Sequence, residues 1–397
     1  MEWICEHCSA PHWYDERLKS KSMTRPHFGM CCLQGQVKLP HLCPAPGILQ
    51  NLLCGISSMS DTFMKNIRQY NAALAFTSVA VKVDEAVTNS SEPYSFRVSG
   101  ELHHRMGSLL PAEGEQMSYA QLYIHDLIET LGMCNHRNPN LKPEIMSALQ
   151  GLLHDVNPYV PLYRHAYLIM KDKPHEEYPN LEVRLHVGDG TDGQWYNLPT
   201  ADELAAVIPG DGTEEVKNEQ DIVLCMHDQS LKRISQLHPS YQSLHYVLLF
   251  PYGELGWNRY IPLEETETGT HTKHKKVTQH LYYAYRLHER PMIEPDAPLF
   301  CGGRLTQQYI VDTWASIEQS DLNWVQNNQK TIRADLYKGL VDAATNADGL
   351  QNSGQHIVLP SSHTGSPRAM YQLYQDSMAI CRALQKPDIF LTMTANP

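Results

Sequence analysis

The chain has 397 residues, a formal net charge of −12 and 42% hydrophobic residues. This length predicts two or three domains, and the composition suffices for buried cores. The negative charge excludes a uniformly basic nucleic-acid-binding protein. No apolar run approaches the roughly 20 residues of a membrane span, and the first five residues do not resemble a signal peptide. We therefore expect no membrane association and, because ten cysteines are scattered along the chain, a reducing compartment.

The acidic excess lies in the middle of the chain. Residues 61–279 contain 18 Lys and Arg against 29 Asp and Glu, whereas residues 280–397 contain 9 against 11. Net charge therefore does not exclude a DNA-binding surface at either end of the chain.

The first cysteines have metal-ligand spacing. Cys5 and Cys8 form a C-x2-C pair, and Cys31 and Cys32 follow about two dozen residues later. Zn²⁺ takes four tetrahedral sulfur or nitrogen ligands, so this pattern predicts a zinc-ribbon-like module over residues 1–48. Neighbouring residues seldom both reach one metal, and the alternatives for one of the second pair are His12, His27, His41 and Cys43. The competing interpretation is a set of reduced, buried cysteines.

A mixed α+β region is predicted for residues 49–261. Helices are expected at 63–75 and 144–154, and strands at 76–83, 183–187 and 222–226. The histidines of Gly100–Arg105 suggest a metal site, but we interpret this stretch as a polar turn after a strand. The aromatic run 241–257 is expected to pack in a core or against a partner, with base stacking as the alternative.

Residues 262–279 are rich in charge and poor in apolar side chains, which is typical of an exposed linker. A helix at 279–288 is expected to open the next domain. The chain contains no Gly-x4-Gly-Lys-Ser/Thr sequence, so these residues do not include the phosphate-binding loop of an ATP-driven motor.

The C-terminal domain, residues 280–397, is predicted to combine helices and strands. Residues 305–344 are compatible with two helices, with a break at Asn327-Asn328. Ser366-Pro367 is a helix start, with Ser as N-cap and Pro at the first helical position. Ile389–Thr394 reads as a buried strand. Because a strand with nothing after it leaves an unpaired edge, we expect the chain to end inside a domain.

Several motifs of this domain resemble the Helitron helicase-like N-terminal domain, the replication-initiator (Rep) part of Helitron transposases. They are Leu299-Phe-Cys-Gly-Gly-Arg304, Val358-Leu-Pro-Ser-Ser362, Gly365-Ser-Pro-Arg368 and Lys386-Pro-Asp-Ile-Phe-Leu-Thr-Met-Thr-Ala-Asn-Pro397. The resemblance is specific from about Tyr282 onward, extends upstream through His238–Trp257, and reaches the N-terminal cysteines. Ala395 departs from the Cys expected before Asn-Pro.

The resemblance implies an HUH-type endonuclease fold, truncated at its C-terminal side. Such enzymes nick single-stranded DNA with a tyrosine, and two histidines flanking a hydrophobic residue hold Mg²⁺ or Mn²⁺. In the family the histidine pair and the tyrosines follow the strand that corresponds to Ile389–Thr394. This chain contains no His-hydrophobic-His sequence. Tyr282, Tyr283, Tyr371 and Tyr374 precede the strand, so we interpret them as helix-packing residues and assign no catalytic residue.

The sequence therefore predicts an α+β protein: a zinc-ribbon-like module, a mixed middle region and an incomplete HUH-type domain. The expected role is DNA binding in rolling-circle transposition, in the nucleus. The predicted partners are single-stranded DNA and the helicase part of the transposase, with Mg²⁺ or Mn²⁺ only if the HUH site is completed. The alternatives are a nickase completed by other sequence or by a partner, and a non-enzymatic interaction module.

Four residues are the predicted DNA contacts. Thr392, Thr394 and Asn396 lie on or beside the last predicted strand. Arg368 could meet a phosphate at the start of its helix. For each of them, capping or sheet packing is the alternative role.

Overall fold

A computed structural model describes most of the elements expected from the sequence. The described residues are 3–19, 26–83, 98–106, 122–123, 127–171, 182–186, 205–206, 221–225, 232–264, 275–294, 297–329, 359–363 and 366–384. They form two compact units, 1–81 with 102–314, and 82–101 with 315–397. Within them the fold is a mixture of helices and short strands, in agreement with the α+β prediction. The predicted domains, 1–48, 49–261, the linker 262–279 and 280–397, stay predictions.

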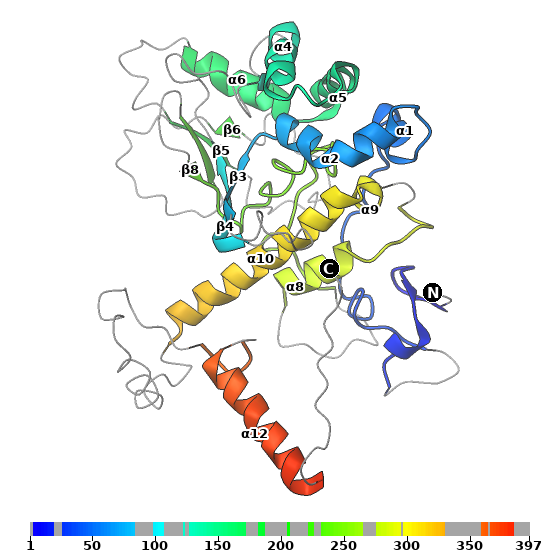
Figure 1. Ribbon diagram of the computed structural model, residues 1–397, viewed down its shortest axis with the longest axis vertical. Helices are drawn as coiled ribbons and strands as arrows, with labels where there is room; N and C mark the ends of the chain where they lie inside the picture. The colour runs from blue at the N-terminus through cyan, green and yellow to red at the C-terminus, as the bar shows by residue number, and fades with distance from the viewer. Residues whose placement is uncertain are drawn as a thin grey trace, which may run out of the picture. The chain divides into compact units, whose positions relative to one another are not determined.

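Helices make up most of the regular structure (Figure 1). In chain order they are η1 Tyr14–Glu16, α1 Gly47–Leu53, α2 Ser60–Leu74, α4 Leu127–Arg137, α5 Pro143–Val156, α6 Tyr159–Lys171, α8 Gln279–Arg286, α9 Pro298–Cys301, α10 Arg304–Asn327 and α12 Pro367–Leu384. None of the described helices is long and apolar enough to cross a membrane.

The strands are short and pair in three small sheets. They are β1 Trp3–Ile4, β2 Pro11–His12, β3 Ser78–Val83, β4 Val98–Met106, β5 Glu182–His186, β6 Ala205–Ala206, β7 Asp221–Cys225 and β8 Lys232–Arg233. β1 pairs with β2, β4 lies between β3 and β8, and β5 lies between β6 and β7. The strands predicted near residues 183–187 and 222–226 are confirmed as β5 and β7, which pair antiparallel.

The interpretation of Gly100–Arg105 as a polar turn is wrong, because these residues lie within β4. Alternation along the strand turns the His104 side chain into the protein, where it is fully buried. The turn interpretation failed because it weighed the polarity of the two histidines above the period-two pattern of the strand.

The helices of the first unit pack through amphipathic faces. In α2 the buried residues Phe63, Ile67, Tyr70 and Leu74 recur at spacings of four, three and four, which places them on one face. This face contributes to a core that includes α1 and α5. In Figure 1, α4, α5 and α6 lie together beside α1 and α2. At the end of α2, the Phe76 ring stacks between the rings of Tyr123 and Tyr163.

Residues 238–250, which we call the buried loop, pass through this core although they form turns rather than a helix or strand. Every residue of the buried loop is buried, so its backbone groups need partners inside the protein. Gln242 supplies one link to each of two helices: its Nε2 donates to the Tyr283 hydroxyl at 2.7 Å, and its Oε1 accepts from the Tyr309 hydroxyl at 2.9 Å. The aromatic side chains of Tyr241, Tyr246 and Phe250 are buried in this core, as the preferred interpretation of 241–257 predicted.

The corner before α10 requires a glycine. A Cβ atom on Gly302 would lie 2.6 Å from the Leu249 Cδ2 atom and 2.8 Å from the Thr306 Oγ1 atom. The missing side chain therefore lets the helix approach the buried loop closely. This close approach explains the first Gly of the Gly302-Gly303 pair in physical terms.

The helix predicted after Ser366-Pro367 is confirmed as α12. The Ser366 Oγ atom accepts a hydrogen bond from the Ala369 backbone N–H at 3.1 Å, which is the geometry of an N-cap. The side chains of Tyr371 and Tyr374 are more than half exposed, so the prediction that they pack within the helix assembly is not met among the described residues. Tyr282 and Tyr283 are buried, as predicted.

We predict that Asn71 holds the buried loop against α2. Its Nδ2 donates to the His245 carbonyl at 2.8 Å, and its Oδ1 accepts from the Leu248 N–H at 3.2 Å. Asn71→Leu removes both partners from buried backbone groups, so it should lower the free energy of unfolding by about 2–4 kcal/mol in urea titrations. Asn66→Leu, on the same helix and partly exposed, is the control and should cost under about 1 kcal/mol. Equal effects would contradict this role for Asn71.

Candidate functional site

The four cysteines predicted as metal ligands lie together in the structure. The sulfur atoms of Cys5, Cys8, Cys31 and Cys32 all lie within 4.8 Å of one another, and all four side chains are buried. The Cys32 sulfur lies 3.8 Å from the sulfurs of both Cys5 and Cys31. Tetrahedral ligands about 2.3 Å from a zinc ion are about 3.8 Å apart, so the cluster has the size of a Cys₄ metal site.

Tight turns in the backbone bring the adjacent pair Cys31-Cys32 to one point. Leu33 and Gln34 have positive φ angles of 50° and 55°, and Gly35 follows with 84°. The turn allows the Gly35 backbone N–H to donate to the Cys32 sulfur at 3.2 Å. A hydrogen bond of this kind stabilises a sulfur that carries negative charge. Ser9, with a φ of 58°, makes the corresponding turn after Cys8.

The alternative ligands lie elsewhere. His27 Nδ1 is 2.7 Å from the Glu6 carboxylate, His12 Nδ1 is 2.6 Å from the Glu16 carboxylate, and Cys43 is exposed. His41 lies 3.4 Å from the carboxylate of Glu294. The structure therefore brings both Cys31 and Cys32 to the cluster, which includes none of these alternatives.

The chemistry of the cluster favours a cation. Hydrogen bonds with Cys31 and then Cys32 lower the pKa of the Cys5 thiol to about 7, whereas hydrogen bonds with Cys32, Cys5 and Cys8 raise the pKa of Cys31. The four sulfurs therefore compete for a limited number of protons. A divalent metal removes this competition, because all four sulfurs bind it as thiolates. The cluster is thus suited to hold a metal ion such as Zn²⁺.

A second cluster of polar side chains surrounds His104, in the core of the first unit. The His104 Nε2 atom is 2.7 Å from the Asp312 carboxylate, and its Nδ1 atom is 2.9 Å from the Tyr241 carbonyl. The Nδ1–H donates to the carbonyl, and a proton shared with the carboxylate completes the pair. The Tyr241 ring stacks on the imidazole at 3.9 Å between centroids.

The charges of this cluster are balanced internally. Burial opposes ionisation of Asp312, but the electrostatic effect and hydrogen bond of the neighbouring His104 ring hold the pKa of Asp312 below its ordinary value. Burial, and then the charge of His104, lowers the pKa of His245 to about 3, so His245 is neutral. His104 and Asp312 are almost completely buried, and therefore they serve the fold rather than a reaction with a substrate. The alternation of β4 was the sequence signal that could have identified His104.

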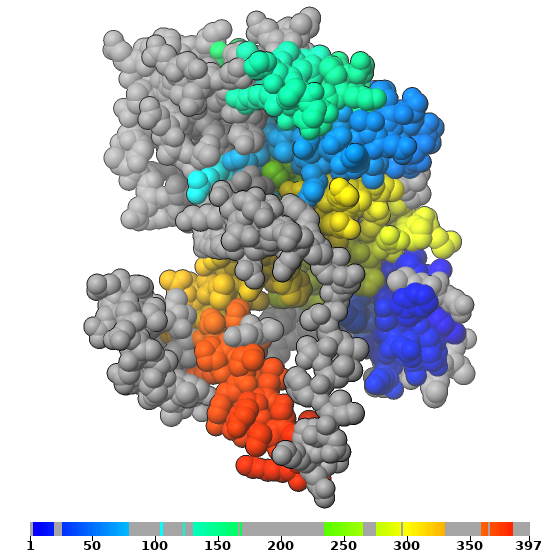
Figure 2. All heavy atoms as spheres, viewed as in Figure 1, coloured from blue at the N-terminus to red at the C-terminus, as the bar shows by residue number. Residues whose placement is uncertain are grey.

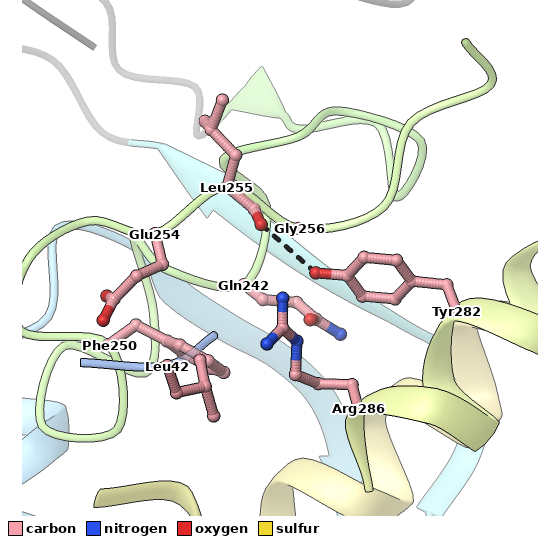
Figure 3. Close-up of a pocket in the computed structure, with 8 residues that line it drawn as sticks. All are labelled: Leu42, Gln242, Phe250, Glu254, Leu255, Gly256, Tyr282 and Arg286. Carbon is pink, nitrogen blue, oxygen red and sulfur yellow. Dashed lines mark hydrogen bonds between the residues drawn. The ribbon is translucent and has the colours of Figure 1, made fainter. Parts of the chain in front are cut away.

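A small pocket opens beside α8 (Figure 3). Glu254 and Arg286 both line it, and the Tyr282 hydroxyl donates to the Leu255 carbonyl at 3.2 Å on one wall. The Oε2 atom of Glu254 is buried without a hydrogen-bond partner among the described residues. The pocket has room for about one water molecule, which would give the Glu254 carboxyl a hydrogen-bond partner.

The predicted DNA contacts are only partly described. Arg368 lies in the first turn of α12, where its side chain is half-buried. Thr392, Thr394 and Asn396 lie outside the described residues. Their role as DNA contacts therefore stays a prediction.

Comparison with known families finds a match in the C-terminal part of the chain. Residues 282–397 match the family model described as the Helitron helicase-like domain at the N-terminus. This match confirms the resemblance inferred from the sequence motifs. No curated protein matches the chain.

We predict that Glu254 makes the stability of the protein depend on pH. Burial raises the pKa of its carboxyl from 4.5 to about 7. Below pH 4.5 the Glu254 carboxyl is protonated in both the folded and the unfolded state, so it does not affect stability. As the pH rises towards 7, this carboxyl ionises first in the unfolded state. The folded state therefore loses up to about 3 kcal/mol of stability. Glu254→Gln should therefore unfold at higher urea than wild type at pH 8, with the difference vanishing near pH 4.5.

The control for this measurement is Glu264→Gln, which alters an exposed carboxylate paired with Lys38. Glu264→Gln should change the free energy of unfolding little, and this change should not grow between pH 4.5 and 7 as that of Glu254→Gln does. A parallel pH profile for wild type and Glu254→Gln would show that the Glu254 carboxyl ionises normally.

Proposed function

We propose that this chain is the DNA-binding part of a Helitron Rep/helicase-like transposon protein that acts in rolling-circle transposition, in the nucleus. The observation that carries the proposal is the match of residues 282–397 to the Helitron helicase-like domain. Single-stranded DNA is the proposed partner, together with the helicase part of the transposase. A structural Zn²⁺ bound by Cys5, Cys8, Cys31 and Cys32 is the proposed cofactor.

The proposed zinc site is structural rather than catalytic. Its four ligands are cysteines, which leave no coordination position for water or a substrate. When bound, the ion would cross-link the segment between β1 and β2, which carries Cys5 and Cys8, to the turn at Cys31-Cys32. All four sulfurs are buried, so substrates have no direct route to the ion. We therefore assign the metal site a structural role in holding the N-terminal module together, and no role in a reaction.

Nicking of DNA is not part of the proposal for these residues alone. Attack on a phosphodiester needs a nucleophile in line with the leaving group, and a metal that stabilises charge on the non-bridging oxygens. The sequence has no His-hydrophobic-His pair to hold Mg²⁺ or Mn²⁺. Thr392, Thr394 and Asn396 are neutral and would hold a divalent cation weakly. A nickase activity would thus require groups supplied by other sequence or by a partner.

We predict about one Zn²⁺ per chain in the purified protein, measured by elemental analysis. Cys8→Ser should abolish stoichiometric binding, because it removes a buried thiolate ligand. Cys54→Ser, which alters an exposed cysteine outside the cluster, is the control and should leave binding unchanged. Absence of zinc, with all ten cysteines freely titratable in the native protein, would refute the site.

We also predict weak, salt-sensitive binding to single-stranded DNA, measured by fluorescence anisotropy. Phosphate contacts release counterions, so affinity should fall steeply with salt. Arg368→Ala should weaken binding and reduce the salt slope by about one. Arg382→Ala, at the exposed C-terminal end of the same helix, is the control, since the helix dipole disfavours phosphate there.

Two outcomes would change the proposal. No binding in low salt up to high micromolar protein would favour a protein-interaction module. Equal losses for Arg368→Ala and Arg382→Ala would remove the specific role of the start of α12 while leaving general DNA binding in place.

A further inference from the structure

Arg290 is a buried cation just after α8. Its side chain is about 1% exposed, although it is among the longest in the protein. The Nη1 atom donates to the carbonyls of Tyr285 and His288, both at 2.8 Å, and the guanidinium lies 3.7 Å from the centre of the Tyr285 ring. These contacts hold the group in one orientation but supply no negative charge.

The other end of the guanidinium faces the cysteine cluster. The Nη2 atom of Arg290 lies 3.8 Å from the sulfur of Cys8, across a sequence separation of 282 residues. Among the described residues no carboxylate forms an ion pair with Arg290. The nearby Glu294 carboxylate instead accepts from the Leu42 N–H at 2.8 Å and lies 3.9 Å from Arg286.

The charge of Arg290 therefore needs a counter-charge, and the cluster can supply it. An arginine stays protonated in proteins, and burying its charge without an anion costs several kcal/mol. Neutral thiols do not offset that cost. Four thiolates around one divalent cation carry two net negative charges, directly beside the guanidinium. The environment of Arg290 is thus suited to a metal-loaded cluster.

We propose that Arg290 is the charge partner of the loaded metal centre, so that metal binding fastens the N-terminal module to residues 285–294. This inference rests on the proposed zinc site. Figure 2 shows the module (dark blue) against the neighbouring part of the chain (yellow). The segment 285–294 lies near the start of the region that matches the Helitron domain. The metal centre would therefore contact that region at the end of α8, its first helix.

Two neighbouring contacts reinforce the attachment without touching the metal ligands. The Arg286 Nη1 atom donates to the Pro40 carbonyl at 2.9 Å, and the His12 and His288 rings lie 5.3 Å apart. Arg286 is therefore a matched control: it is buried, it precedes Arg290 by four residues, and it holds the same part of the chain. It differs in having a carboxylate neighbour and no contact with the cluster.

The first experiment measures Zn²⁺ affinity by competition with a chelating dye, and the absorption spectrum of the Co²⁺-loaded protein. Arg290→Met should weaken Zn²⁺ binding about 10–100-fold, as loss of an outer-shell partner does elsewhere, and should shift the thiolate-to-cobalt bands. Arg290→Lys, which keeps the charge, should recover most of the affinity. Arg286→Met should leave affinity and spectrum unchanged even if it lowers stability.

The second experiment needs no variant. Hydrogen exchange of wild-type protein is compared with Zn²⁺ bound and after chelation. Metal removal should increase exchange at residues 285–294 as well as in the module, with the core helix α5 unaffected.

The results separate this inference from the zinc proposal. Wild-type protein that binds no metal refutes the zinc site itself. Wild-type protein that binds Zn²⁺, with unchanged affinity in Arg290→Met and unchanged exchange at 285–294 after chelation, refutes the role of Arg290 while leaving the site in place.

Discussion

The packing of the first unit depends on the buried pair formed by His104 and Asp312. This pair joins three parts of the chain that no regular sheet or helix pair connects: β4, the buried loop and α10. Because both groups are almost completely buried, the pair is stable only if all three parts are in place, and removing one partner would leave a charge without compensation. The Gln242 side chain then links the same loop to α8 and α10. A polar centre, surrounded by tyrosines, thus sets where the helices meet.

Local sequence patterns predicted many of the helices and strands and the cysteine cluster. They did not predict the contacts between residues far apart in the chain. Ser366-Pro367 predicted the start of α12 because capping depends on residues three positions apart. The cysteine spacing predicted the cluster because few arrangements besides a metal site use that pattern. The pairing of His104 with Asp312 joins residues 208 positions apart, and no local pattern specifies it. Arg290 was missed for the same reason, because its contact with Cys8 joins residues 282 positions apart.

The N-terminal module with the cysteine cluster is in direct contact with the Helitron-like region. Pro40 and Leu42, just after the cysteine cluster, bond Arg286 and Glu294. The Glu264 N–H also donates to the Gln36 carbonyl at 2.8 Å. The boundary that sequence similarity draws at residue 282 therefore does not coincide with a boundary in packing. Isolated expression of residues 282–397 would expose the buried side chains of Arg286, Arg290 and Glu294.

The separation of 282 residues between Cys8 and Arg290 also has a consequence in time. At about 5–20 residues per second, a ribosome needs on the order of 15–60 s to reach Arg290 after it has made Cys8. The four cysteines are complete within the first few seconds of that interval. During the rest of it, the nascent chain carries a thiol cluster that lacks its arginine neighbour. Capture of a metal in this period would protect the thiols from oxidation until the later part of the chain arrives.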